Sequence, residues 1–145
     1  MARIVMEARE FGDDARRLLE RLQAAHRSAP VPGEWMPSVD VIETATTVEI
    51  VMDLPGVRSD AIEVVLSRGT LVIAGAKVPP SCEHRHAAFH LAERSFGRFA
   101  RAVRLSGAVD AGRAHGSLVD GELRIVLPRI AERRGRDIRI EVQAR

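Results

Sequence analysis

Aromatic side chains are scarce in this sequence, and their scarcity limits both its core and its partners. Only 3% of the 145 residues are aromatic, with four Phe, one Trp and no Tyr. The core must therefore be built from aliphatic residues. Nucleic-acid surfaces commonly combine clustered positive charge with stacking aromatics, and the densest basic run, residues 129–136, contains no aromatic residue. Nucleic acid is therefore not expected as a partner.

The sequence also lacks a second cysteine, a long apolar run and a recognisable catalytic motif. Its single cysteine, Cys82, cannot form an internal disulfide, which favours a reducing compartment. No apolar stretch approaches the roughly 18 residues of a membrane span, and charges follow the early apolar residues 4–6 at once, so the expected location is the cytoplasm. There is no P-loop and no acid–base constellation. We therefore expect no enzyme activity and no cofactor.

Residues 1–33 are predicted to form an N-terminal arm that is partly helical. From about residue 12 to residue 27 the apolar positions follow a helical period, which predicts one apolar stripe on a helix. Prolines and a glycine in residues 30–33 end this pattern and predict a linker. The stripe consists of Phe11, Ala15, Leu18, Leu19, Leu22 and Ala25.

Residues 34–128 change to a period of two, which is typical of half-buried β-strands. Short alternating segments are separated by turn residues, among them Pro55-Gly56 and the two-residue hairpin sequence Asp120-Gly121. Several short strands at this spacing predict an all-β domain, an antiparallel β-sandwich. Residues 129–145 form a charged C-terminal extension that ends in another alternating segment.

The long segment between residues 76 and 94 is unusual, because loops of this length in a compact domain are normally functional. Ala87, Phe89 and Leu91 alternate along it, so it is expected to carry a short strand. One interpretation is that this strand pairs with a second subunit and covers an exposed sheet edge, which would place these three residues in a dimer interface. The alternative is a surface loop without a partner.

The C-terminal extension poses the same problem. Ile138 and Ile140 point to one side of an extended chain and would be exposed if the extension stood alone. A stretched ten-residue linker can travel about 33 Å, which is enough to reach a groove on a neighbour. Burying both isoleucines is worth about 3–6 kcal/mol before ordering costs. The alternative is docking on its own sandwich.

Arg101 shares its strand parity with Phe99 and Val103, so the pattern points a permanent charge at an apolar face. A buried charge requires a partner. Either Arg101 lies at a subunit interface and pairs with a carboxylate there, or a β-bulge turns it outward.

The long loop also contains ligand-type residues for zinc or copper, namely Cys82, His84, His86 and His90. The first three would point the same way on an extended strand. Structural zinc sites usually have two spaced ligand pairs with a turn between them, and this spacing differs. We therefore predict no bound metal and a solvated loop, with these four residues as the candidates if a metal does bind.

These features occur in a sequence that resembles the α-crystallin domain and C-terminal tail of bacterial and plant small heat-shock proteins. The resemblance runs from residue 35 to residue 142. Its motifs are Trp35-Met36-Pro37, Leu54-Pro55-Gly56-Val57, the block Glu93-Arg94-Ser95-Phe96-Gly97-Arg98-Phe99-Ala100-Arg101, Asp120-Gly121 followed by Leu127-Pro128-Arg129, and Ile138-Arg139-Ile140.

The resemblance implies an immunoglobulin-like sandwich, a dimer made by exchange of the loop strand, and larger assemblies in which the I-x-I tail fills a groove on a neighbouring dimer. It places Arg101 in the dimer-forming region, and the candidate groove residues are Val64, Leu66 and Leu118. The sequence departs from the family pattern at Ser106 and, at or beside a strand that normally helps to form the groove, at Ala114, Gly116 and Glu122.

The function implied by the resemblance is that of an ATP-independent holdase chaperone, which binds unfolding proteins and prevents their aggregation under heat or other stress. The candidate client-binding residues are Phe11, Leu18, Leu19 and Leu22; packing of this stripe inside the oligomer is a compatible second role. Expected partners are further copies of the chain, non-native proteins and ATP-dependent chaperones that refold them. The alternatives are a metal-binding module or a co-chaperone or scaffold module, because a sandwich fold does not determine a function.

Overall fold

The structure, a computed structural model, describes residues 17, 20–21, 33–81 and 85–131 of the chain. These residues contain the strands β1 (Val39–Glu43), β2 (Thr47–Asp53), β3 (Ile62–Ser67), β4 (Thr70–Lys77), β5 (Gly97–Arg104), β6 (His115–Val119) and β7 (Glu122–Pro128). Two short 3-10 helices, Ser59–Ala61 and Ala111–Arg113, lie between strands. No helix in the described ranges is long and apolar enough to cross a membrane.

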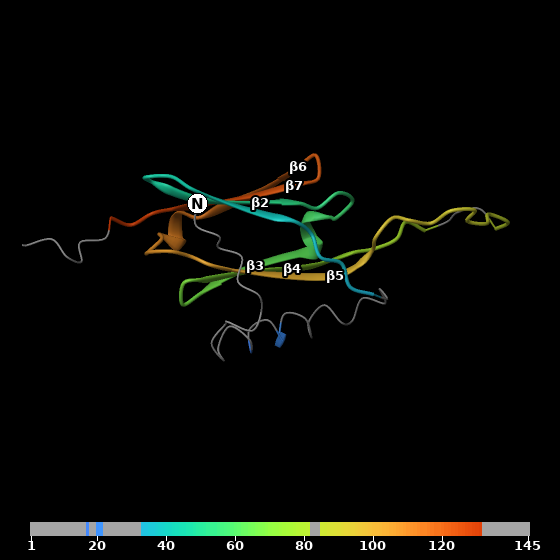
Figure 1. The fold of residues 1–145 in the computed structure, drawn as a ribbon, viewed down its shortest axis with the longest axis horizontal. Coiled ribbons are helices and arrows are strands. Elements are labelled where there is room, and N and C mark those ends of the chain that lie inside the picture. The colour runs from blue at the N-terminus through green and yellow to red at the C-terminus, as the bar shows by residue number, and fades with distance from the viewer. Residues whose placement is uncertain (1–16, 18–19, 22–32, 82–84, 132–145) are drawn as a thin grey trace, which may run out of the picture.

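The strands form two antiparallel sheets, which Figure 1 shows nearly edge-on as an upper and a lower layer. The upper sheet has four strands in the order β1-β2-β7-β6, and the lower sheet has three in the order β3-β4-β5. The predicted all-β antiparallel sandwich is therefore confirmed.

The space between the sheets is filled mainly by aliphatic side chains, as the scarcity of aromatics predicts. Strands β2 and β7 turn every second residue inward, which is the period that a half-buried strand requires. Each large apolar side chain buried in this way contributes about 1.5–3 kcal/mol. The buried core consists of Val48, Ile50, Met52, Leu54, Val57, Leu71, Ile73, Phe99, Val103, Leu105, Leu123, Ile125 and Leu127.

The predicted hairpin at Asp120-Gly121 joins β6 to β7. Both residues have a positive φ, 51° and 80°, as a two-residue hairpin turn requires. The Leu54 amide donates a hydrogen bond to the Gly121 carbonyl at 2.6 Å, and a Cβ on Gly121 would lie 3.0 Å from Pro55 Cα. The hairpin tip is thus held against the turn that follows β2.

Strand β4 is buried along its whole length. Leu71 and Ile73 face the main core, whereas Val72 and Ala74 lie on the opposite face of the sheet with exposed fractions of 0% and 1%. A sheet face that borders water normally carries polar residues. The alternation analysis considered only one buried face here, although an unbroken apolar run such as residues 71–74 is typical of a strand buried on both faces.

Of the helix predicted for residues 12–27, only Arg17, Glu20 and Arg21 are described, and they have helical backbone and exposed side chains. The helix as a whole therefore stays a prediction. The residues predicted to bind clients or to dock the tail lie outside the described residues: Phe11, Leu18, Leu19, Leu22, Ile138 and Ile140.

Candidate functional site

The long loop joins β4 to β5, and Figure 1 shows it projecting beyond the end of the sandwich. No strand is formed in its described residues 85–96, so the short strand expected around Ala87 is not present in the single chain. Strand backbone needs a pairing partner for its N–H and C=O groups. Ala87 is exposed, and the side chains of Phe89 and Leu91 are 83% and 74% exposed. Two large apolar side chains therefore lie in water on a projecting loop.

The root of this loop is fixed by Lys77, a residue to which the sequence analysis gave no role. Lys77 is buried, and its Nζ lies 4.8 Å from the ring centroid of Trp35 and 5.5 Å from that of Phe96. Cations in such positions are attracted by the negative ring face. Trp35 in turn packs edge-on against Phe99, with ring centroids 5.5 Å apart. The only lysine of the chain thus joins both ends of the loop to the segment that opens the domain. The available sequence signal was compositional: lysine occurs once, and its two ring partners are among only five aromatic residues.

Arg101 lies in β5 opposite Ile73 in an uninterrupted register, so the interpretation that a β-bulge turns it outward is wrong. The side chain is half-buried, and its Nη1 donates to the carbonyl oxygen of Pro37 at 2.9 Å. This backbone carbonyl, rather than the expected carboxylate, is its partner in the described part of the chain. The contact ties β5 to the segment that leads into β1. A role of Arg101 in a subunit interface stays a prediction.

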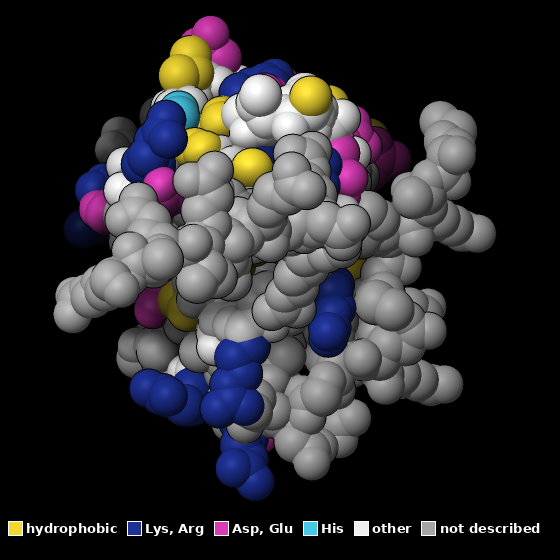
Figure 2. Space-filling view, turned by 90° about the vertical axis from the view of Figure 1, so that its left-hand side faces the viewer, with side chains coloured by type: hydrophobic (Ala, Val, Ile, Leu, Met, Phe, Trp, Pro, Cys, Tyr) yellow, Lys and Arg dark blue, Asp and Glu magenta, His cyan; other side chains and the backbone are white. Residues whose placement is uncertain are grey.

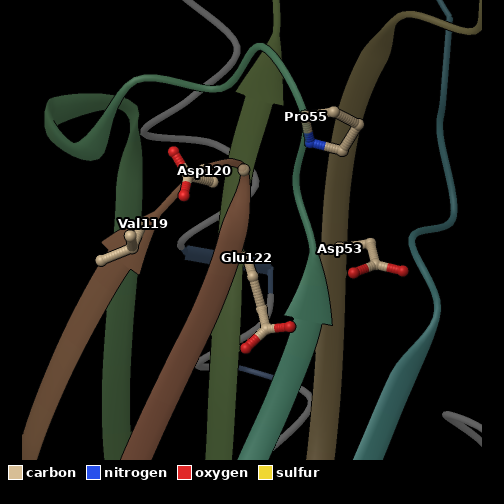
Figure 3. Close-up of a pocket in the computed structure, with 6 residues that line it drawn as sticks. Asp53, Pro55, Val119, Asp120 and Glu122 are labelled. Atoms are coloured by element: carbon tan, nitrogen blue, oxygen red, sulfur yellow. The ribbon is translucent and has the colours of Figure 1, made fainter.

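The three candidate groove residues lie on β3 and β6, the edge strands of the two sheets. Figure 3 shows these strands on the same side of the sandwich. Leu66 and Leu118 are half-buried and pack against the same core, and Val64 is 40% exposed. The structure therefore brings two of the three residues to one core between two open sheet edges, with Val64 presenting apolar surface beside them.

The departures from the family pattern near this groove have different consequences. Glu122 points to the outer face of the four-stranded sheet, where its carboxylate accepts from Arg124 at 3.1 Å, and Arg124 also donates to Glu49 at 2.8 Å. The two carboxylates raise the pKa of the Arg124 guanidinium above its ordinary value. Glu122 therefore brings no charge into the groove. Ala114 packs against the core, and a Cβ on Gly116 would make only ordinary contacts.

A pocket lies at the tip of the β6–β7 hairpin, beside the end of β2 (Figure 3). Three of its lining residues, Asp53, Asp120 and Glu122, are acidic. On the face that Figure 2 shows, the visible acidic side chains lie mostly towards the four-stranded sheet, whereas basic side chains lie on both sides of the sandwich. No cluster of metal-binding side chains occurs in the described ranges. The pocket thus offers acidic surface without a metal site.

The candidate metal ligands of the long loop are only partly described. Cys82 and His84 lie outside the described residues, and His86 and His90 are exposed. Metal binding at this loop therefore remains untested.

The comparisons with known proteins agree with this architecture. Residues 40–143 match the Hsp20/alpha crystallin family, so the chain belongs to the Hsp20/alpha crystallin family. It is 34% identical over 101 residues to heat shock protein 16 of Schizosaccharomyces pombe, a match that covers 69% of this chain and 71% of that protein. It is 30% identical over 104 residues to small heat shock protein C4 of Rickettsia felis, covering 72% of this chain and 63% of that protein.

Solved structures show the same fold. Heat shock protein 16.0 from Schizosaccharomyces pombe has a TM-score of 0.62 and 30% identity, covering 75% of this chain and 99% of that one. A small heat-shock protein from Xylella fastidiosa has a TM-score of 0.62 and 32% identity, covering 76% of this chain and 100% of that one. Among curated relatives the shared part shrinks to 52% of a 21.9 kDa heat shock protein of rice. Membership of this family supports a chaperone role and self-association.

Proposed function

We propose that the chain is an ATP-independent holdase, which binds unfolding proteins and keeps them from associating with one another. The observation that carries this proposal is the exposure of Phe89 and Leu91, 83% and 74%, on a loop that projects from an otherwise closed sandwich. Contiguous exposed apolar residues mark interaction surfaces. A protein with such residues is built to associate, first with copies of itself.

The dimer would form by pairing of residues 87–91 with the edge of β1 on a second subunit. Strand β1 has five residues and pairs only with β2 in the described chain. The outer edge of β5 is instead partly occupied, because Trp35 donates to the Arg98 carbonyl at 2.9 Å. An added strand would satisfy the β1 edge. Burying the side chains of Phe89 and Leu91 would contribute about 3–6 kcal/mol before ordering costs.

Larger assemblies would form when Ile138 and Ile140 of one subunit enter the groove between β3 and β6 of another. The groove walls, Leu66 and Leu118, are half-buried in the single chain, so the floor already belongs to a packed core. Two isoleucines again add only about 3–6 kcal/mol before ordering costs. A contact of this size is reversible, so the assembly can loosen on heating.

Client capture would use the stripe with Phe11, Leu18, Leu19 and Leu22. A holdase acts by mass action, because binding of the non-native chain lowers its free concentration. In the unstressed protein the stripe must be covered by other apolar surface, and under stress it must be exposed to clients. Heating achieves this if it shifts the population towards states in which the contacts of the stripe are broken.

The proposal is tested by measuring native mass and client protection on the same set of variants. Phe89→Ser/Leu91→Ser should dissociate the dimer, and Ile138→Ser/Ile140→Ser should reduce large assemblies to dimers. Ala88→Ser/Ala92→Ser changes the other face of the same loop segment and should leave the mass unchanged. Wild-type protein should suppress the light scattering of a heated client without ATP.

A wild-type chain that runs as a monomer near 15.9 kDa and leaves client aggregation unchanged would refute the proposal. Loss of assembly in the Ala88→Ser/Ala92→Ser control as well would count against the strand-exchange geometry alone.

A further inference from the structure

The outer face of the three-stranded sheet is apolar and yet shielded from water. Val72 and Ala74 alternate with core residues along β4 and so face away from the sandwich interior, but their exposed fractions are 0% and 1%. Their cross-strand neighbours on this face include Val65 on β3 and Ala100 and Ala102 on β5, all only partly buried.

The flanking residues are too small to produce this burial. Side chains of one sheet stand side by side, so an alanine cannot cover the top of a central valine. Burial of this degree needs a second layer over the sheet, as in any stable layered domain. The described elements do not provide it, because β4 packs chiefly with β3, β5 and the 3-10 helix Ser59–Ala61.

The described residues of the N-terminal arm lie on the side of the sheet where such a layer would have to be. Arg17, Glu20 and Arg21 have helical backbone and exposed side chains. At spacings of three and four they lie on one face of a helix, which is the face opposite the predicted stripe. In Figure 1 these residues, drawn in blue, lie below the three-stranded sheet, on the side away from the four-stranded sheet.

The connection to the arm has the length that such docking in the same chain needs. The described domain begins at Gly33, whose carbonyl accepts from the Arg98 amide at 3.2 Å on β5. Strand β4 is the next strand of the sheet, only about 5 Å further in. The seven residues 26–32 can span up to about 24 Å, so the stripe can reach the β4 face of its own chain.

We infer that the outer face of the three-stranded sheet is a docking surface for the apolar stripe of residues 11–25 of the same chain. This face is nearly flat because three of its residues are alanines, so a helix can pack closely against it. These residues are Ala74, Ala100 and Ala102. The inference deepens the proposed function and rests on it in one respect: release of the arm exposes the stripe and the sheet face together, and so adds the sheet face to the apolar surface that a client can meet.

The test begins with Ala74→Cys in a Cys82→Ser background of the full chain, followed by measurement of the alkylation rate of the new thiol. Leu18→Ser/Leu19→Ser/Leu22→Ser should raise this rate by about ten-fold or more. The reason is that a covered thiol reacts only when the arm is transiently released, whereas in this variant the thiol stays exposed. Arg17→Ser/Glu20→Ser/Arg21→Ser, on the opposite helix face, should leave the rate within about two-fold. An unchanged rate in the leucine variant would overturn the inference.

A second measurement uses an intact domain and decides which chain supplies the stripe. Leu19→Cys/Ala102→Cys in the Cys82→Ser background should crosslink within one chain when treated with a short bis-maleimide. A mixture of the two single variants should give no two-chain product. A two-chain product from the mixture, or no crosslink in the double variant, would overturn the inference. Failure to protect a heated client would instead refute the holdase proposal and leave both chemical results standing.

Discussion

Replacement of Arg101 by methionine tests whether its contact with Pro37 supports the domain. Methionine keeps much of the apolar length of the arginine stem but removes the guanidinium that donates to the Pro37 carbonyl at 2.9 Å. A hydrogen bond with a charged donor is worth about 1.5–3 kcal/mol. Because Pro37 is buried and Arg101 is half-buried, water replaces the lost donor only in part, and we expect Arg101→Met to lower the free energy of unfolding by about 1.5–3 kcal/mol.

The assay is urea unfolding followed by the fluorescence of Trp35, the only tryptophan. All variants carry Ile138→Ser/Ile140→Ser, so that dissociation of large assemblies contributes little to the unfolding transition. With a urea dependence of about 2 kcal/mol per molar for a chain of this size, the midpoint should fall by roughly 0.8–1.5 M. Arg104→Met is the matched control, since Arg104 lies on the same strand and is exposed. Equal midpoints for Arg101→Met and the background, or an equal loss in the control, would refute the reasoning.

Two further predictions follow from single contacts. Gly75→Ala should lower the free energy of unfolding by about 1–3 kcal/mol in the same assay, because its Cβ would lie 2.7 Å from the Phe99 ring; Gly116→Ala, with only ordinary contacts, should cause no such loss. Arg58 lowers the pKa of Asp60 chiefly through a hydrogen bond, so the contribution of Asp60 is present above the unfolded-state value of about 4 and is lost as the pH falls through the lowered folded-state pKa. Midpoints measured from pH 6 to pH 2 should therefore decline less for Asp60→Asn, and identical pH profiles would show that the pair does not stabilise the fold.

The sandwich could be predicted because local features determine most of it. The Asp120-Gly121 pair strongly favours one turn, and it positions β7 against β6. The alternation in β2 and β7 then fixes which side chains enter the core, since a slip by one residue would expose every one of them. Candidate groove residues such as Leu118 were instead named because the family resemblance implies a groove there, and their role stays a prediction.

The remaining features depend on groups far away along the chain. Strand parity predicts that Arg101 faces inward, but its partner Pro37 is 64 residues away and offers a backbone carbonyl, which no residue type reveals. Lys77 had no predicted role, because its two ring partners come from separate segments of the chain. The buried outer face of β4 could not be predicted from alternation, which assigns each strand one buried face and does not show what covers the other.

Three contacts of the candidate site converge on residues 33–37. This segment pairs with β5 at Arg98, places Trp35 against Lys77, and supplies the carbonyl to which Arg101 donates. The arm, the loop root and the entry to β1 therefore depend on one short stretch of backbone. Groups that share a support in this way are not independent. In the urea assay, the effect of Lys77→Met/Arg101→Met should differ from the sum of the two single effects by about 0.5 kcal/mol or more. If the two single effects on the free energy of unfolding add exactly, the loop root and the entry to β1 are held independently. Loosening of the loop would then not be coupled to the arm through residues 33–37.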